Sequence, residues 1–273
     1  MGLNSPSEIA KNYVEIGKAK VNLPIDKMFL LAVAAGAFIA FGGVGAATAS
    51  VGVTPSSLGK LISGCIFPGG LTLVLLAGSE LFTGNCLLSI PLLEKEITVK
   101  QLLRNWIVVY FGNMAGGMLV AARRVFSGHY HMFDGNMAVS VFSTAAAKCT
   151  LTFSDAFMKG IFCNILVCLA VWVAFSAKDA AGKVISLFLP ILIFVVCGFE
   201  HCVANMYYIS ACLFGKNASG YVEAAEAACI NLSVITWKNF FITNLVPVTL
   251  GNIVGGSLCV GAVYWYVYLR KVK

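Results

Sequence analysis

The sequence has few charged residues. Aspartate, glutamate, lysine and arginine make up 11% of its 273 residues, whereas hydrophobic residues make up 59% and the mean hydropathy is +0.87. Soluble domains carry about 25% charged residues, so the composition predicts an integral membrane protein. No stretch alternates between polar and apolar residues as a barrel strand does. The apolar runs instead fit six helical crossings of about 20 residues each.

The sequence also lacks the signals of a processed or metal-binding chain. Residues 1–27 are polar and have no apolar signal core, so we expect them to be retained. The ten cysteines include no pair with the two-residue spacing of a zinc or redox motif, so we expect no metal and no cofactor. The net charge of +7 comes mainly from residues at the ends of apolar runs, so nucleic acid is not an expected partner.

The first segment carries the pattern of a surface helix. Ser5 and Glu8 are spaced as a capping box. Ile9 and Tyr13 then fall on one face at helical spacing, and charged residues fall on the other. We therefore expect residues 1–27 to hold a cytoplasmic, interfacial amphipathic helix, which is either an anchor or oligomer contact or part of a gate.

Six apolar segments follow and form one expected channel domain, residues 28–269. The expected crossings are 28–50, 61–93, 106–122, 156–177, 184–214 and 240–269. The second and fifth are too long for a simple crossing, and glycines beside polar residues interrupt them. Most basic residues flank one set of ends, so the positive-inside rule predicts that both termini, including the tail 270–273, are cytoplasmic.

The two interrupted segments share a sequence pattern. Residues 78–85 and 198–205 carry glycine, glutamate and asparagine at the same relative positions. A Gly-Asn-x-x-Gly-Gly motif also occurs twice, at 112–117 and 251–256. Three crossings in each half would turn the second copy over, so the pattern predicts an inverted 3+3 repeat with broken second and fifth helices. Paired broken helices of this kind are typical of a transport site near the membrane midplane.

Each interruption carries one glutamate, Glu80 or Glu200, at a depth where an ionised group is costly. We expect these carboxylates to accept hydrogen bonds from the free backbone N–H groups at the breaks. Asn85 and Asn205 are further expected supports of the two breaks. Direct contact of either glutamate with substrate is the alternative.

His201 belongs to one half only, because its counterpart in the other half is Leu81. An imidazole can donate to an anion or exchange a proton with it, and Thr83 on the opposing break can complete such a site. A core histidine that is satisfied by a neighbouring group is the alternative. Lys148 lies in an expected loop before the fourth crossing, where its charge either concentrates anions or is simply solvated.

Apolar side chains are expected to line the remaining pathway. Rings of such side chains exclude water and can gate by dewetting. The expected hydrophobic constrictions are Phe67, Leu71, Leu81, Phe82 and Phe194. Asn164 and Asn252 are polar residues on apolar crossings, and each is either a packing contact between helices or a polar contact in the pore.

Three segments resemble the signatures of the formate/nitrite transporter family, and within it the bacterial hydrosulfide channels. They are Glu-Leu-Phe-Thr-Gly-Asn at 80–85, Gly-Phe-Glu-His-Cys-Val-Ala-Asn-Met at 198–206 and Pro-Val-Thr-Leu-Gly-Asn at 247–252. The resemblance implies an aquaporin-like protomer of six helices with its own pore. It also implies assembly as a homopentamer in the bacterial inner membrane.

The resemblance also implies roles for single residues. His201 corresponds to the central histidine of the family, Thr83 to its loop threonine and Lys148 to its outer-vestibule lysine. Asn164 and Asn252 correspond to its pore asparagines, and the five apolar residues named above correspond to its constrictions. Cys202 departs mildly from the pattern of formate channels, which typically carry serine there.

These features predict a channel for small monovalent weak-acid anions rather than an enzyme. Hydrosulfide is the expected preferred permeant, and formate and nitrite are further permeants. The alternative is a formate or nitrite transporter that couples transport to protons. A water or glycerol channel would carry Asn-Pro-Ala at both breaks, and neither break contains proline. A membrane enzyme would need a nucleophile beside a base, and no such spacing stands out.

Overall fold

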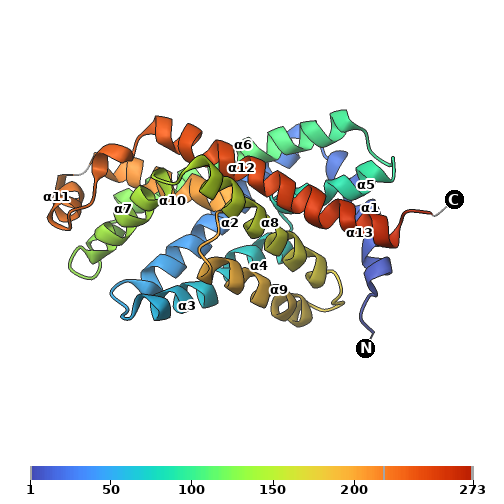
Figure 1. The fold of residues 1–273 in the computed structure, drawn as a ribbon, viewed down its shortest axis with the longest axis horizontal. Coiled ribbons are helices and arrows are strands. Elements are labelled where there is room, and N and C mark those ends of the chain that lie inside the picture. The colour runs from blue at the N-terminus through green and yellow to red at the C-terminus, as the bar shows by residue number, and fades with distance from the viewer. Residues whose placement is uncertain (1, 218, 272–273) are drawn as a thin grey trace.

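The computed structural model describes residues 2–217 and 219–271, which form a bundle of helices (Figure 1). Five helices in these ranges are long and apolar enough to cross a membrane. They are α2 (Ile25–Ser50), α3 (Ser56–Ile66) continued by α4 (Pro68–Leu76), α6 (Val99–Phe126), α8 (Phe153–Ala174) and the segment Asn239–Tyr268, which includes α12 (Val246–Ile253) and α13 (Val263–Tyr268). The shorter apolar helices α9 (Ala180–Val196) and α10 (Cys202–Gly215) complete the bundle.

Helices α4 and α9 end in the same way inside the bundle. Each is followed by a glycine, Gly78 or Gly198, whose φ of +75° or +67° lies in the left-handed region that glycine favours. The residue after each glycine donates its N–H to the carbonyl five residues earlier, at 3.0 and 3.1 Å. The chain is then irregular until the short helix η1 (Gly84–Leu88) or α10 begins. We call these irregular segments, residues 78–83 and 198–201, break 1 and break 2.

In both halves, the repeated glycine motif lies where one helix packs closely against a helix that precedes it in the sequence. A Cβ added at Gly116 of α6 would collide with the carbonyl oxygen of Val33 in α2. A Cβ added at Gly255 would collide in the same way with the carbonyl oxygen of Ile161 in α8. Small residues allow such close approach where lipid provides no hydrophobic drive between helices. The two copies of the motif therefore perform the same packing task.

Two helices lie outside the six expected crossings, α7 (Asn136–Cys149) and α11 (Ser219–Ala227). Lys148 is in the last turn of α7, so its expected location in a loop is wrong. Val141, Phe142 and other apolar residues of α7 are buried at helical spacing, and α7 packs against α10 (Figure 1). Helix α7 is too short and too polar to be recognised as a crossing, which is why the hydropathy pattern did not reveal it.

The first helix, α1 (Pro6–Val21), has the predicted capping box between Ser5 and Glu8. Its apolar face contacts protein, because Ile9 and Tyr13 are buried within the main hydrophobic core. It packs mainly against α5 (Ser89–Leu93), α6 and α13. Helix α1 therefore covers one end of the bundle.

Candidate functional site

The two breaks meet through a hydrogen bond between Thr83 and His201. The Oγ1 atom of Thr83 lies 2.9 Å from Nε2 of His201, and both side chains are buried. The other ring nitrogen of His201, Nδ1, accepts a hydrogen bond from the backbone N–H of Ala204 at 3.0 Å. A backbone N–H can only donate, so the hydrogen of the neutral ring is on Nε2 and points to Thr83. The hydroxyl hydrogen of Thr83 is then left to donate to a passing solute.

At break 1, Glu80 is held by side chains. Lys20 of α1 lies 2.8 Å from one carboxylate oxygen, and Nδ2 of Asn85 donates to the other at 2.7 Å. Asn85 also donates to the side-chain oxygen of Asn105 at 2.9 Å. The side chain of Glu80 is only 6% exposed, so this ion pair is well shielded from solvent.

Break 2 repeats this arrangement with different residues. Lys148 of α7 lies 2.9 and 3.0 Å from the two carboxylate oxygens of Glu200. Asn205 donates to Glu200 at 2.6 Å and to the side-chain oxygen of Asn244 at 2.8 Å. Each glutamate is therefore neutralised by one lysine and braced by a chain of two asparagines.

Our expectation that the two glutamates bind the backbone N–H groups of the breaks is wrong. Two asparagines do so instead, because a side-chain amide can accept a hydrogen bond from one backbone segment and donate hydrogen bonds to another. Asn113 accepts from the N–H of Phe82 and Asn252 accepts from the N–H of Cys202, both at 2.9 Å. Their amide nitrogens donate to backbone carbonyls, including that of the glutamate in the same break.

Asn113 was missed in the sequence analysis although it has a sequence signal. It is the asparagine of the first Gly-Asn-x-x-Gly-Gly motif, at the position that Asn252 occupies in the second. The side chain of Asn252 forms three hydrogen bonds, all with backbone groups, and these occupy its oxygen and both of its amide hydrogens. Of the two roles left open for Asn252, the geometry therefore favours the structural one.

Asn164 supports the Thr83 side of the site. Its amide nitrogen donates to the carbonyl oxygen of Thr83 at 3.2 Å and to that of Asn252 at 2.7 Å. Its side-chain oxygen has no hydrogen-bond partner within the part of the chain that the structure describes. Asn164 thus fixes the backbone of break 1 beside the Thr83 hydroxyl and keeps one free acceptor.

Four of the five expected constriction residues line one of two cavities. A wide vestibule of about 620 Å³ is bordered by Phe67, Phe194 and His201. The rings of Phe67 and Phe194 pack edge to face with centroids 5.5 Å apart, and Phe194 stacks on His201 at 6.0 Å. On the other side, Leu71 and Leu81 border a cavity of about 40 Å³. A buried apolar layer with His201 and Thr83 therefore lies between the two cavities.

Phe82 lines neither cavity. Its ring packs on Tyr110 and Trp106, with centroid distances of 5.0 and 6.0 Å. The structure therefore separates Phe82 from the four other apolar residues that the sequence analysis grouped with it.

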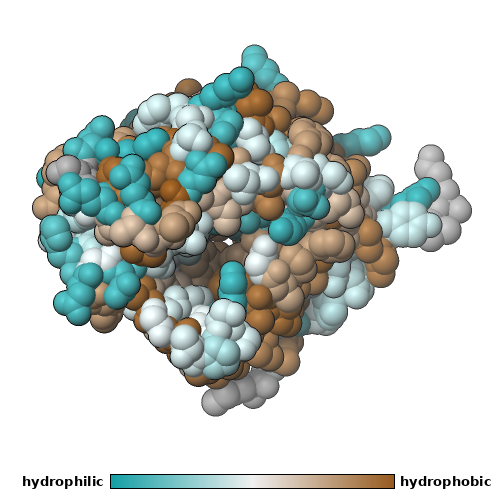
Figure 2. All heavy atoms as spheres, turned by 60° about the vertical axis from the view of Figure 1, so that its left-hand side comes forward, coloured by the Kyte–Doolittle hydropathy of each residue, from teal (hydrophilic) through white to brown (hydrophobic). Residues whose placement is uncertain are grey.

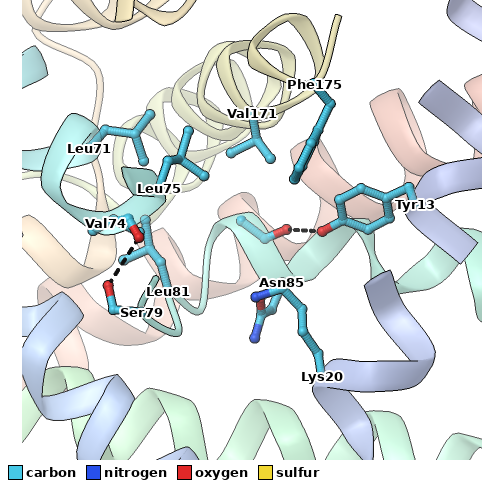
Figure 3. A pocket seen from close by; sticks show the side chains of 11 residues that line it. Tyr13, Lys20, Leu71, Val74, Leu75, Ser79, Leu81, Asn85, Val171 and Phe175 are labelled. Atoms are coloured by element: carbon cyan, nitrogen blue, oxygen red, sulfur yellow. Dashed lines mark hydrogen bonds between the residues drawn. The ribbon is translucent and has the colours of Figure 1, made fainter. Parts of the chain in front are cut away.

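Helix α1 closes the smaller cavity (Figure 3). The hydroxyl of Tyr13 donates to the carbonyl oxygen of Gly84 at 3.2 Å, and Lys20 reaches Glu80 from the same helix. Lys18 of α1 pairs with Glu96 at 3.1 Å, and hydrogen bonds to Glu96 and to Glu15 raise the pKa of Lys18 above its ordinary value. Break 1 is therefore covered, whereas break 2 faces the open vestibule.

Two cavities on either side of a buried polar contact, within a bundle of apolar helices, define a membrane channel or transporter for small solutes. The family model described as formate/nitrite transporter matches residues 7–266. The chain therefore belongs to the formate/nitrite transporter family, as its sequence motifs predicted.

Individual relatives agree with this assignment. A probable formate transporter of Methanothermobacter thermautotrophicus is 39% identical over 98% of both chains. The formate channel FocA of Escherichia coli K12 is 38% identical over 97% of this chain and 95% of its own. The solved structure of a pentameric formate channel with formate bound is 37% identical, with a TM-score of 0.81, and the match covers 90% of this chain and 98% of that one.

Proposed function

We propose that this protein is a channel for small monovalent weak-acid anions, with formate first and nitrite and hydrosulfide as further permeants. The observation that carries the proposal is the buried contact of 2.9 Å between Thr83 and His201, which lies between two cavities. The names of the relatives support formate as the first substrate. The preference for hydrosulfide that we expected from the sequence therefore becomes one outcome of the test.

In the proposed pathway the anion enters the vestibule and passes the rings of Phe67 and Phe194. A bare charge in an apolar passage is strongly disfavoured, so a hydrogen-bond donor is needed at the centre. The hydroxyl of Thr83 donates a hydrogen bond to the anion, and the Nε2–H group of His201 can donate to the anion in place of Thr83. The solute then leaves past Leu71 and Leu81 into the cavity under α1.

The contact between Ala204 and His201 favours hydrogen-bond donation over proton storage at the histidine. A doubly protonated ring would direct an N–H of Nδ1 against the backbone N–H of Ala204, which now donates to that nitrogen. We therefore place proton-coupled formate or nitrite transport second. In that alternative, the proton reaches the anion from the solvent of a cavity.

The proposal extends to the architecture and assembly. We infer six crossings, with α9 and α10 together forming the fifth, arranged as an inverted 3+3 repeat. The matched hydrogen-bond networks at Glu80 and Glu200 support this inference. We also propose a homopentamer, a channel domain over 28–269, and cytoplasmic segments at 1–27 and 270–273 in a bacterial inner membrane. The pentameric formate channel supports the oligomer, and the distribution of basic residues supports the orientation.

The test is solute uptake into proteoliposomes with formate, nitrite, hydrosulfide and chloride at several pH values. We expect formate to be fastest and chloride to be excluded. His201→Asn, which keeps an N–H donor, should retain much of the formate flux, and His201→Phe should lose at least about tenfold. Faster hydrosulfide flux would reverse the substrate order. A pH dependence that disappears in His201→Asn would favour proton exchange, and no flux of any solute would overturn the channel itself.

A further inference from the structure

The vestibule on the break 2 side contains an excess of positive charge. Lys60 of α3, Lys148 of α7 and Lys159 of α8 all line it, and Glu200 is the one acidic residue among its described lining residues. Figure 2 looks toward the end of the molecule that carries α3 and α7, and it shows a hollow near the centre of this face. The vestibule therefore carries two more positive charges than negative ones among its described lining residues.

Lys148 contributes little to that excess. Its ammonium group bonds to both carboxylate oxygens of Glu200, and the two side chains are only 15% and 7% exposed. It also lies 5.5 Å from the centre of the Tyr208 ring, whose face is electron-rich. A close pair of opposite charges has a weak field at a distance. We expected the charge of Lys148 either to concentrate anions or to be simply solvated, but in the structure Glu200 compensates it.

Lys60 and Lys159 have no carboxylate within 4.0 Å among residues 2–217 and 219–271. Both nonetheless lie close to break 2. A Cβ at Gly198 would lie 3.9 Å from Nζ of Lys60, and the backbone carbonyl of Lys159 accepts from the N–H of Glu200 at 3.3 Å. The Lys60 ammonium group and the backbone of Lys159 therefore lie beside break 2, which ends at His201.

The rest of the lining suits a partly hydrated anion. Six serine and threonine side chains border the same space, namely Ser50, Ser56, Ser63, Ser140, Ser143 and Thr144. The hydroxyls of Ser50, Ser63 and Thr144 donate to backbone carbonyls. Those of Ser56, Ser140 and Ser143 have no acceptor among the described residues, so they can donate to an anion as it loses water. A cavity with uncompensated lysines and apolar walls concentrates field lines and raises the local concentration of anions.

We propose that Lys60 and Lys159 form the anion-collecting site of this channel, whereas Lys148 is a positioning residue that holds Glu200. The site takes small monovalent anions, and the proposal rests on the proposed channel function. The two lysines raise the anion concentration in front of the apolar layer without touching the solute at its centre. They therefore act on the capture of the anion and not on its passage between Thr83 and His201.

The test compares formate uptake by the wild-type protein and by Lys60→Gln/Lys159→Gln in proteoliposomes of neutral lipid. At low ionic strength, we expect the half-saturating formate concentration to rise about fivefold in the double variant, with the saturating rate within twofold. At about 1 M salt the Debye length is near 3 Å, so the two proteins should become indistinguishable. Lys178→Gln/Lys183→Gln, which removes two positive charges that do not line the vestibule, is the matched control and should behave as wild type.

Lys60→Arg/Lys159→Arg separates charge from structure, since it keeps both charges on different side chains. It should retain the wild-type half-saturation. The collecting site is overturned if the half-saturating concentration is unchanged in the glutamine variant, or if it rises equally in the arginine variant. In either case, formate flux through the wild-type protein leaves the channel proposal intact. Absence of flux in the wild-type protein would instead overturn the channel function on which the site rests.

Discussion

Break 1 and break 2 have nearly the same scaffold but different chemistry. In both, a glutamate is paired with a lysine and bonded to an asparagine, and a second asparagine holds the following backbone N–H. Residues 78–85 and 198–205 differ at five positions, and at two of these the first half has Leu81 and Thr83 where the second half has His201 and Val203. The parts that repeat satisfy buried polar groups in an apolar medium, and the parts that differ include Thr83 and His201, which meet the solute in the proposed pathway.

The surroundings of the two breaks also differ. Helix α1 lies over break 1 and leaves a cavity of about 40 Å³, whereas break 2 opens to about 620 Å³. The lysine partners come from unrelated elements, Lys20 from α1 and Lys148 from α7. The difference in access therefore accompanies a difference in neighbouring helices, α1 at break 1 and α7 at break 2.

The largest expected effect comes from removing either glutamate. Glu80→Leu and Glu200→Leu each leave a lysine unpaired in a poorly solvated position, which costs about 3 kcal/mol of stability. Because the two networks match, we expect similar decreases in melting temperature in detergent. The paired variants Lys20→Leu/Glu80→Leu and Lys148→Leu/Glu200→Leu should recover much of the loss. A large decrease in melting temperature for the variant at one break alone would show that the two networks contribute unequally to stability.

A smaller but equally symmetric effect is expected at the two backbone-binding asparagines. Asn113→Leu and Asn252→Leu each leave a buried backbone N–H and two carbonyls without these partners, which costs about 2 kcal/mol. Thermal unfolding monitored by circular dichroism measures both. Asn164→Leu is a useful reference, because it removes two hydrogen bonds to carbonyls but no backbone N–H partner. If Asn252→Leu were stable but inactive, its role would lie in the pore and not in the scaffold.

The next comparison exchanges a hydroxyl group and a methyl group between Thr83 and Val203, which occupy equivalent positions in the two halves. Thr83→Val removes the partner of His201 at nearly constant volume, and we expect a loss of about 1 kcal/mol in stability and of about tenfold in formate flux. Val203→Thr, the reciprocal change, should leave formate flux within twofold. Flux assays in proteoliposomes check both variants. Equal losses from the two changes would mean that the packing around the breaks, and not the Thr83 hydroxyl, limits transport.

The sequence located the two breaks because the signals for them are local and repeated. The glycines, glutamates and asparagines at 78–85 and 198–205 located both breaks without any knowledge of their contacts. It did not predict that Lys20 would reach Glu80, because these two residues are 60 positions apart and no pattern in either segment indicates that they pair. Contacts of this kind depend on how whole helices pack. The same holds for α7, whose docking turned a lysine expected in a loop into a partner of Glu200.

The smallest expected effect concerns the cover of break 1, which break 2 lacks. Hydrogen bonds from the backbone and side chain of Ser5 lower the pKa of Glu8 below its ordinary value. The folded protein therefore binds this proton less readily than the unfolded chain, and the cap stabilises α1 fully only above the ordinary pKa of Glu8, about 4.3. As the pH falls through the lowered value, the stabilisation is lost and the first turn of α1 should open.

Hydrogen exchange of the α1 amides between pH 7 and pH 3.5, corrected for intrinsic rates, measures this opening. Exchange in the first turn of α1 should increase relative to the first turn of α6, whose capping box between Thr98 and Gln101 contains no carboxylate. Ser5→Ala should show the faster exchange already at pH 7 and little further change on acidification. If the wild-type first turn stayed protected at pH 3.5, then Tyr13 and Lys20 alone would hold α1 over break 1, and the cover would be insensitive to acid at its start.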